Sequence, residues 1–432
     1  MEANYFGIPS LLEECNLECR AKLSSDPATS YMTIRSYLKS VRYGGSLKIV
    51  YEATPLLKAL DEIWSPFCLT GVLSLASIPN KPIFKQSTIQ SLNLDELIAA
   101  ATQSPFGRGT QTVVDTTVRN SFEIPAASLR DKTLTALSKC IDVSALSRTQ
   151  ELALKPYKLV IYKEGGHFHE HRDTVRGEGH IGTLVVVLNS TYTGGELEVT
   201  HGGRTETVTG AYSWVAMYGD CLHKINPVTS GTRVSLIYDI YHEESYRWCY
   251  GSVTDSVWNC GYFTQIPHNA LPRGVDEAQR AAVIAGMHQQ LEGFEAAVVC
   301  LQHLYPACQA NPDFLKGGDQ LLYDILQSHF ELAVLPCTIY RKVIDLNMAR
   351  NYTLEDAVFC IKPLHMGDIP AEQCHAKLSN EAVRLKTNFI MVGYLARDHV
   401  LEREDIDYTG NDAQGEETVY MVAGLQVRRK SK

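Results

Sequence analysis

Short apolar runs separated by glycine-containing turns dominate the middle of the chain. After Lys155 the runs are rich in β-branched and aromatic residues and lie at Tyr157–Tyr162, Thr183–Leu188, Leu197–Thr200, Thr205–Val208, Ser213–Met217, Cys221–Ile225 and Thr232–Tyr241. Glycines separate them, as at Gly165-Gly166 and Gly194-Gly195. Many short strands at this spacing are typical of an antiparallel sandwich or barrel. The pattern therefore predicts a strand-rich core of the jelly-roll kind within residues 56–245.

Helical periodicity is found on both sides of this core. Apolar residues recur at helical spacing from Leu11 to Cys19 and over Tyr31–Val41, Leu94–Ala101, Leu129–Val143, Val275–Leu304 and Asp319–Leu332. Strand-like runs return at Phe389–Leu395 and Thr418–Val427. We therefore expect a mixed α+β protein in which helices flank a sheet.

These patterns divide the sequence into three parts. Residues 1–55 are expected to form an N-terminal helical region, residues 56–245 the strand-rich domain, and residues 246–432 an additional C-terminal α/β region packed on that core. The opening segment 2–11 resembles the tail of a BTB/POZ tetramerisation-type domain, but the body of that fold is missing. An ordinary amphipathic helix is the better interpretation of this segment.

Composition and charge narrow the classes of partner. Of the 432 residues, 45% are hydrophobic, which is enough to bury a sizeable core. Lysine and arginine number 40 against 49 aspartates and glutamates, a formal net charge of -9. An acidic chain has no general attraction to phosphate backbones or to anionic lipid. Nucleic acid is therefore an unlikely partner.

The sequence also predicts the cellular compartment. The start lacks the basic and apolar regions of a signal peptide, and no apolar run reaches the roughly 18 residues of a membrane span. The chain has 12 cysteines and no Cys-x-x-Cys pair, which favours reduced, buried thiols over a disulfide framework. We expect a cytoplasmic or nuclear protein that is neither secreted nor associated with a membrane.

The densest group of candidate metal ligands follows Tyr162. On a strand the side-chain period is two, so His171 and Asp173 would point the same way, and His223 would complete the set from a later strand. Two imidazoles and a carboxylate leave three positions open on an octahedral ion, the arrangement of non-haem Fe(II) oxygenases. His167 and His169 share the same alternation, so a cupin-like site that uses them stays open on spacing alone.

Arg233 follows His223 by ten residues across a turn-like segment, 227–231. A hairpin centred near Val228 would place positions 223 and 233 opposite each other with their side chains on the same side. A buried guanidinium there would need an anion, and it suits bidentate binding of a carboxylate. The sequence therefore predicts a carboxylate cosubstrate beside the metal.

In order and spacing, these residues resemble the Fe(II)/2-oxoglutarate-dependent dioxygenases of the prolyl 4-hydroxylase type. The resemblance covers roughly residues 60–245, and it is closest to a poorly characterised, mainly fungal branch of that superfamily. The supporting phrases are Gly194-Gly195-Glu196-Leu197, His201-Gly202-Gly203, the segment from Pro227 to Arg233, Ser104 to Gly109, and Tyr408 to Asp412. The family implies a double-stranded β-helix core.

The resemblance assigns roles to individual residues. It implies that His171, Asp173 and His223 bind iron and that Arg233 pairs with the C5 carboxylate of 2-oxoglutarate, with Ser235 adding a hydroxyl. Tyr162 matches a tyrosine near the cosubstrate, although a tyrosine that ends a strand is also commonly packing. Many prolyl hydroxylases have a second tyrosine where this chain has Val187. Expected cofactors are Fe(II), 2-oxoglutarate and O2, with ascorbate as a further candidate.

The implied activity is hydroxylation of a C–H bond, with 2-oxoglutarate decarboxylated to succinate and CO2. Proline in a peptide or protein is the first substrate to expect, and no catalytic residue is expected beyond the metal centre. The alternatives are a catalytically silent metal-binding scaffold of the same fold and a nucleobase demethylase. The intact set of ligands argues against the scaffold, and the acidic composition argues against the demethylase.

Overall fold

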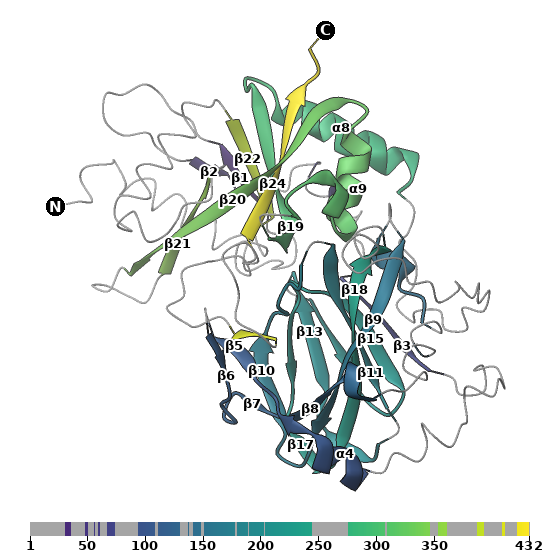
Figure 1. Cartoon of the computed structure of the whole chain (residues 1–432). Coiled ribbons are helices and arrows are strands. Elements are labelled where there is room, and N and C mark those ends of the chain that lie inside the picture. Colours follow the sequence, from purple (N-terminus) through teal and green to yellow (C-terminus); the bar gives the residue numbers. More distant parts are fainter. Residues whose placement is uncertain are drawn as a thin grey trace. The chain divides into compact units, whose positions relative to one another are not determined.

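The computed structural model describes residues 67–73, 94–243, 275–345 and 421–431 with short gaps, strands at 31–35, 48–50, 353–360, 387–392 and 408–409, Gly410, and the helical residues 56, 59 and 60 (Figure 1). The chain divides into two compact units. The central unit comprises Ser65–Pro272 and Asp405–Val419, and the other comprises Met1–Trp64, Arg273–Glu404 and Tyr420–Lys432. The expected three consecutive regions stay a prediction, and both observed units are discontinuous in sequence.

The central unit contains a large antiparallel sheet. Its strands, in spatial order, are β3 (Cys68–Val72), β15 (Ser213–Tyr218), β11 (His180–Val187), β18 (Arg233–His242), β9 (Leu152–Tyr162), β8 (Phe122–Pro125) and β4 (Thr102–Gln103). A second antiparallel sheet has the order β14 (Arg204–Val208), β13 (Leu197–His201), β16 (Leu222–Ile225), β10 (His167–His171) and β7 (Arg119–Asn120). Each strand that the sequence predicted between residues 157 and 241 overlaps one of these, which confirms the strand-rich, antiparallel core.

The chain passes repeatedly between the two sheets. In sequence order β9, β11, β15 and β18 belong to the large sheet, whereas β10, β13, β14 and β16 belong to the second. Two small sheets complete the unit: β12 (Tyr192–Gly194) pairs with β17 (Val228–Gly231), and β5 (Phe106–Arg108) lies between β23 (Tyr408–Thr409) and β6 (Gln111–Val113). Strand β10, which carries the His-rich motif, therefore lies inside the second sheet between β16 and β7.

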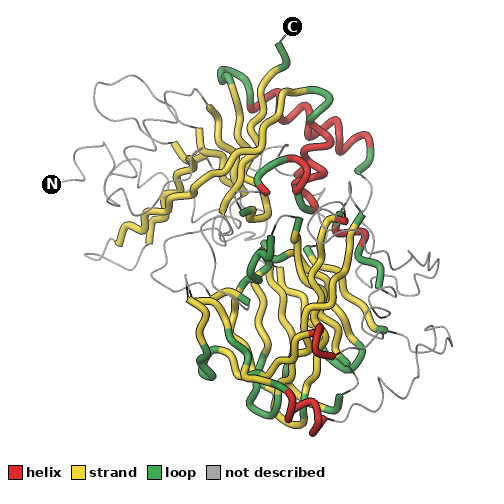
Figure 2. The backbone as a smooth tube through the Cα atoms, viewed as in Figure 1, coloured by secondary structure: helices red, strands yellow, loops and turns green. Residues whose placement is uncertain are grey.

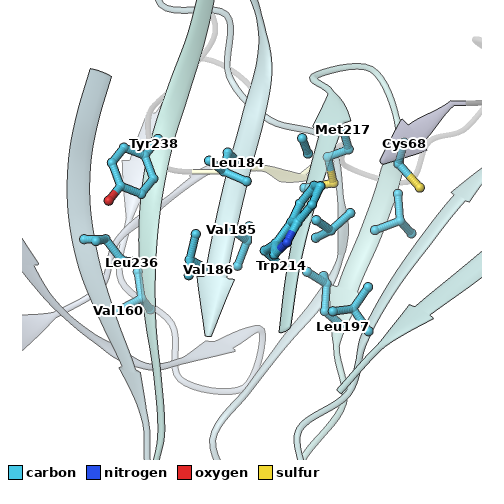
Figure 3. Close-up of a cluster of buried hydrophobic side chains, with 14 of the residues drawn as sticks. Cys68, Val160, Leu184, Val185, Val186, Leu197, Trp214, Met217, Leu236 and Tyr238 are labelled. Atoms are coloured by element: carbon cyan, nitrogen blue, oxygen red, sulfur yellow. The ribbon is translucent and has the colours of Figure 1, made fainter. Parts of the chain in front are cut away.

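Large apolar side chains pack on the central strands of the large sheet (Figure 3). Leu184, Trp214 and Tyr238 are fully buried. Trp214 faces Gly71 on the neighbouring strand, where an added Cβ would lie 2.5 Å from the indole ring. Gly71 thus provides the space that the indole occupies. Burying each such side chain stabilises the fold by about 1.5–3 kcal/mol, which makes this sheet a rigid support for the site described below.

The other unit is a seven-stranded sheet with helices packed on it (Figure 2). The strand order is β2 (Lys48–Val50), β1 (Tyr31–Arg35), β22 (Thr387–Val392), β19 (Ala296–Tyr305), β24 (Met421–Arg429), β20 (Phe330–Asp345) and β21 (Thr353–Cys360). Helix α8 (Glu277–Gln290) begins with a capping box between Asp276 and Gln279. Val283 and Met287 of α8 join the apolar face of α9 (Gly317–Leu326) in one core with β19 and β24.

Three helix predictions were wrong in part. Of the expected helix Val275–Leu304, only the first part is helical, as α8, and the last part is the buried strand β19. The expected helix Asp319–Leu332 likewise ends with α9 before β20 begins. A continuous apolar run buried on both faces of a sheet has no period that separates it from a helix. The start of the segment Tyr31–Val41 forms β1, so the N-terminal region is not all helical.

Other predicted helices fared differently. Helix α4 (Leu94–Ala100) confirms the prediction for Leu94–Ala101. The predicted segment Leu129–Val143 falls mostly outside the described residues, as does the stripe from Leu11 to Cys19. Among the helices that the structure describes, none is long and apolar enough to cross a bilayer.

Candidate metal centre

Three side chains converge in the central unit. His171 ends β10, Asp173 follows it by two residues, and His223 lies on the adjacent strand β16. His171 and His223 are directly opposite each other in the ladder, with ring centroids 4.1 Å apart. One potential ligand atom from each of the three residues lies within 4.8 Å of the others, and all three residues are buried. The structure thus brings together the set that the sequence predicted to bind a metal.

A bulge in β10 separates His171 from the other histidines. Phe168 pairs with Ile225, but His171 pairs with His223, so β10 has one residue more than β16 between these positions. The extra residue shifts the alternation, and Phe168 and His171 both become buried, with their rings stacked at 3.6 Å. His169 is exposed. The expectation that four ligands share one strand face was therefore wrong.

His167 is also engaged elsewhere. Its ring nitrogens lie 3.0 Å from the carbonyl oxygen of Gly165 and 3.1 Å from that of Thr117. It is half-buried, on the far side of the bulge from His171. The geometry therefore favours His171 with Asp173 over the cupin-like use of His167 and His169.

Backbone carbonyls orient both imidazoles of the site. The Nδ1 atom of His171 lies 2.7 Å from the carbonyl oxygen of His169, and that of His223 lies 3.0 Å from the carbonyl oxygen of Cys221. Because a carbonyl oxygen only accepts, Nδ1 carries the proton in each ring, and Nε2 keeps its lone pair for a metal. Burial and the neighbouring His223 hold the pKa of His171 well below its usual range, so this ring is neutral.

Asp173 lies just beyond the end of β10 and is held by a residue that the sequence did not single out. Thr183, on β11, donates its hydroxyl to Oδ2 of Asp173 at 2.5 Å, and Oδ1 faces Nε2 of His223 at 3.9 Å. Burial raises the pKa of Asp173, but His223 and Arg176 outweigh it, and the pKa is lowered to about 2. The carboxylate is therefore ionised, with one oxygen bonded and the other directed to the centre.

Gly410 forms part of the wall of this site from far along the chain. Its N–H donates to the carbonyl oxygen of Arg172, and its carbonyl oxygen accepts from Nη1 of Arg119 at 2.8 Å. A Cβ added to Gly410 would lie 2.6 Å from Oδ1 of Asp173. Only glycine leaves room for the carboxylate here. No spacing rule in the sequence connects residue 410 to residue 173.

We expect Gly410→Ala to weaken metal binding roughly 10- to 100-fold, the range for losing a group that orients a ligand, because the methyl group must displace Asp173 or β23. The measurement is an anaerobic Fe(II) titration of the full chain. Gly210→Ala is the control, because nothing lies within 4 Å of its added Cβ although its φ of +89° makes that change strained as well. An unchanged iron affinity in Gly410→Ala would contradict this account of the wall.

Arg233 does not lie opposite His223, so the predicted hairpin was wrong. His223 is on β16 in the second sheet, whereas Arg233 begins β18 in the large sheet and pairs with Tyr162 on β9. The intervening residues form β17, which pairs with β12 instead. Gly231, at the end of β17, has a φ of +77°, which glycine adopts readily as the chain turns into the other sheet.

The Arg233 guanidinium is nevertheless buried among the residues that the sequence associated with it. Only 1% of Arg233 is exposed, and Nη1 donates to the Ser235 hydroxyl at 2.6 Å. Its guanidinium carbon lies 5.7 Å from the centre of the Tyr162 ring, and burial lowers its pKa although the tyrosines at 162 and 192 oppose this. Nε and Nη2 are buried without a hydrogen-bond partner. Such a group would be stabilised by a carboxylate.

The residues present therefore fit a divalent metal and a carboxylate ligand. Two imidazoles and one ionised carboxylate leave half of an octahedron open, which is the donor set of non-haem Fe(II) oxygenases. The unpartnered N–H groups of Arg233 fit an anion. The sequence had suggested no role for Thr183, Tyr192 or Gly410, although Gly410 lies in the segment Tyr408–Asp412 that resembles the family. The alternation of β11 is a signal that could have found Thr183.

Comparison with known proteins gives one family. Residues 157–240 match the family model described as the 2OG-Fe(II) oxygenase superfamily. No curated protein matches the chain. The segment matched by the model contains each residue that the sequence predicted to bind metal or cosubstrate.

Several solved structures are similar at low identity. A prolyl-4-hydroxylase from Pseudomonas putida is 16% identical, with a TM-score of 0.28, over 43% of this chain and 99% of that one. A prolyl hydroxylase from Trichoplax adhaerens, solved with a hypoxia inducible factor peptide, is 13% identical, with a TM-score of 0.30, over 44% and 90%. The viral collagen prolyl hydroxylase of Paramecium Bursaria Chlorella virus-1 is 17% identical, with a TM-score of 0.25, over 41% and 97%.

Proposed function

We propose that the 2OG-Fe(II) oxygenase domain, which this chain carries over residues 157–240, is an active dioxygenase that hydroxylates a C–H bond. Membership in this superfamily implies Fe(II), 2-oxoglutarate and O2. The observation that carries the proposal is the convergence of His171, Asp173 and His223 in the unit that also buries Arg233 with unpartnered N–H groups. A buried guanidinium of this kind is costly to maintain unless it binds an anion.

The strand connections support a double-stranded β-helix for the central unit. The chain alternates between the two antiparallel sheets from β9 to β18, with β13 and β14 adjacent in the second sheet. In this arrangement His171 and His223 lie on one sheet and Arg233 on the other. A site built between two such sheets would have its metal ligands and its anion-binding group on opposite walls.

Each site residue has a part in the proposed reaction. Fe(II) and 2-oxoglutarate, when bound, supply the oxidation of an unreactive C–H bond by O2, with release of succinate and CO2. His171, His223 and Asp173 would hold the metal through two Nε2 atoms and one carboxylate oxygen. Arg233 and Ser235 would hold the distal carboxylate of 2-oxoglutarate, and Tyr162 would pack beside it. Burial of these groups excludes water and strengthens the charge interactions.

The substrate proposed first is a prolyl residue in a peptide or protein. It rests on the resemblance of the motifs between residues 60 and 245 to prolyl 4-hydroxylases. Ascorbate is proposed as the reductant that maintains Fe(II), and the cytoplasm or nucleus as the compartment. The thiols of Cys68, Cys221 and Cys300 are buried and form no disulfide among the described residues, which agrees with a reducing environment.

The test is the conversion of 2-oxoglutarate to succinate by the purified full chain with Fe(II) and ascorbate. An oxygenase is expected to form some succinate without substrate and more with a prolyl peptide. A catalytically silent scaffold would bind iron and form none. Iron bound in one equivalent with no succinate above the heat-treated control would therefore favour the scaffold and end the proposal.

A further inference from the structure

A set of buried charges lies beside the metal centre in the central unit. Its cations are Arg119 on β7, Lys158 on β9 and Arg176 in the loop after Asp173, and its carboxylates are Glu123 on β8 and Asp239 on β18. All five side chains are at most 16% exposed. The proposed reaction assigns none of them a role, so their charges need another explanation.

One end of this set reaches the metal ligand Asp173. Thr183, which donates to Asp173, is the direct cross-strand neighbour of Asp239 on β18. Asp239 in turn forms an ion pair with Nη1 of Arg176. Facing residues of an antiparallel pair project on the same side of the sheet. Asp239 and the Arg176 guanidinium that pairs with it therefore lie on the same side of the sheet as Thr183. Beside the effect of burial, Asp173 is close enough for its charge to raise the pKa of both.

The other end reaches the metal ligand His171. The Phe168 ring stacks on His171 at 3.6 Å, and the guanidinium of Arg119 lies over Phe168 at 4.5 Å. Glu123 lies between two cations, 3.6 Å from Arg119 and 2.6 Å from Lys158. The charged set thus begins at one metal ligand and ends at another.

Tyr157 joins the two ends. Its ring has the Arg176 guanidinium at 3.9 Å on it and the Lys158 ammonium at 4.9 Å. Tyr157 is the extra residue of a bulge in β9, because Ile237 pairs with Lys158 while Tyr238 pairs with Pro156. Bulges re-aim side chains and are common beside active sites. Here the bulge places two cations on one aromatic ring.

The set has more cations than anions. Three cationic side chains face two carboxylates, and Nε and Nη2 of Arg176 are buried without a hydrogen-bond partner. Burial, and then Arg119, lower the pKa of Lys158 to about 7, although Glu123 opposes this, so its amine is only partly charged at neutral pH and gains charge when an anion binds. By contrast, Fe(II), Asp173, Arg233 and dianionic 2-oxoglutarate would together be neutral. Arg176 pairs with Asp239, which lies six residues along β18 from Arg233, so this excess positive charge is separate from the group proposed to hold the cosubstrate.

We propose that the substrate carries a carboxylate near the carbon to be oxidised, and that Arg176 and Lys158 bind it. This inference rests on the proposed function, since it concerns the substrate of that same site. The carboxylate belongs either to an acidic residue of a peptide or to the end of a chain or free imino acid. In both cases Arg176 offers two N–H donors and Lys158 a point charge.

The test is a binding measurement on the full chain loaded with Mn(II) and 2-oxoglutarate, which does not turn over. The probes are matched pairs: N-acetylproline against N-acetylprolinamide, and an amidated peptide with glutamate next to proline against its glutamine twin. The charged member of at least one pair is expected to bind on the order of tenfold more tightly, the strength of a charge-assisted pair. A preference in the first pair would show that the site binds a terminal carboxylate. A preference in the second pair would show that it binds an acidic side chain.

Variants separate this role from a structural one. Arg176→Gln and Lys158→Gln should each remove most of the preference, whereas Asp239→Asn should increase it by freeing Arg176. Lys163→Gln, in a lysine that lies over Phe122, is the matched control and should leave the preference unchanged. If Arg176→Gln does not fold, the double variant Arg176→Gln/Asp239→Asn replaces it, because neutralising both partners leaves no buried charge unpaired. This double variant should also lose the preference.

Two results would overturn the inference. One is the absence of preference for the charged probe in both pairs with the parent protein, and the other is a preference that Asp239→Asn lowers as much as Arg176→Gln does. Succinate formation without any probe tests the oxygenase separately. Succinate without preference would leave the oxygenase standing and remove only the carboxylate site.

Discussion

Replacing Asp173 with alanine is expected to abolish stable iron binding and succinate formation. Two imidazoles remain, but the charged carboxylate is gone, and the loss of affinity should exceed the roughly 10- to 100-fold that the loss of an orienting group carries. The measurement is iron per chain after anaerobic gel filtration, together with a melting curve. Asp95→Ala, an exposed position on α4, is the matched control and should keep its iron. A full equivalent of iron on the Asp173→Ala protein would refute the assignment of the ligand.

A graded variant strengthens this test. Thr183→Val keeps the carboxylate and removes only the hydroxyl that donates to its Oδ2 atom. Iron affinity should fall within that 10- to 100-fold range rather than vanish. The ordering of parent, Thr183→Val and Asp173→Ala would separate a ligand from the group that positions it, whereas equal affinities in parent and Thr183→Val would show that the hydrogen bond has no such role.

Replacing Arg233 with methionine should weaken 2-oxoglutarate binding roughly 10²- to 10⁴-fold while iron binding is kept. A buried charge pair that loses one partner costs about 3–5 kcal/mol. In the absence of the cosubstrate the same change should not destabilise the protein, because a buried guanidinium with unpartnered N–H groups is itself costly. The measurements are 2-oxoglutarate titration of the Mn(II)-loaded chain and thermal melting without ligand.

Two further variants, a smaller change at the same site and a control, test whether this result is specific. Ser235→Ala removes a single hydroxyl beside Nη1 of Arg233 and should cost about tenfold or less. Lys163→Met changes a charge on the same unit without touching Arg233 and should have no effect. If Arg233→Met bound 2-oxoglutarate as tightly as the parent, the cosubstrate would have to be held elsewhere, and the proposed site would be wrong.

Much of the central unit could be predicted from the sequence because local pattern and tertiary structure agree there. Runs such as Thr183–Leu188 and Thr232–Tyr241 are rich in β-branched residues, are each preceded by a glycine, and are buried in the large sheet. Spacing alone left His167 and His169 as alternatives to His171 and Asp173, and the resemblance to the oxygenase family selected the second pair. Asp173 lies beyond the strand, and the bulge between Phe168 and His171 decides which histidine is buried.

What the sequence could not predict depends on contacts between distant segments. The ten-residue interval from His223 to Arg233 suggested a hairpin, yet the chain crosses between sheets within it. Glycine is required at position 410 because of its contact with Asp173, which is distant in the sequence. The buried strand β19 was taken for helix because burial on both faces removes the alternation that identifies a strand. The roles of His171, Asp173, His223, Tyr162, Arg233 and Ser235 stay predictions until the variants are measured.

The place of β23 in the central unit also bears on how the protein is made. Tyr408 pairs with strand β5, and Gly410 lies against the carboxylate of Asp173. Both are synthesised more than two hundred residues after the segments that they contact. On the ribosome the proposed iron pocket would therefore lack this wall after His171, Asp173 and His223 have been synthesised. A recombinant fragment cut at residue 245 would retain that unfinished state, with an unpaired sheet edge at Phe106–Arg108 that invites self-association.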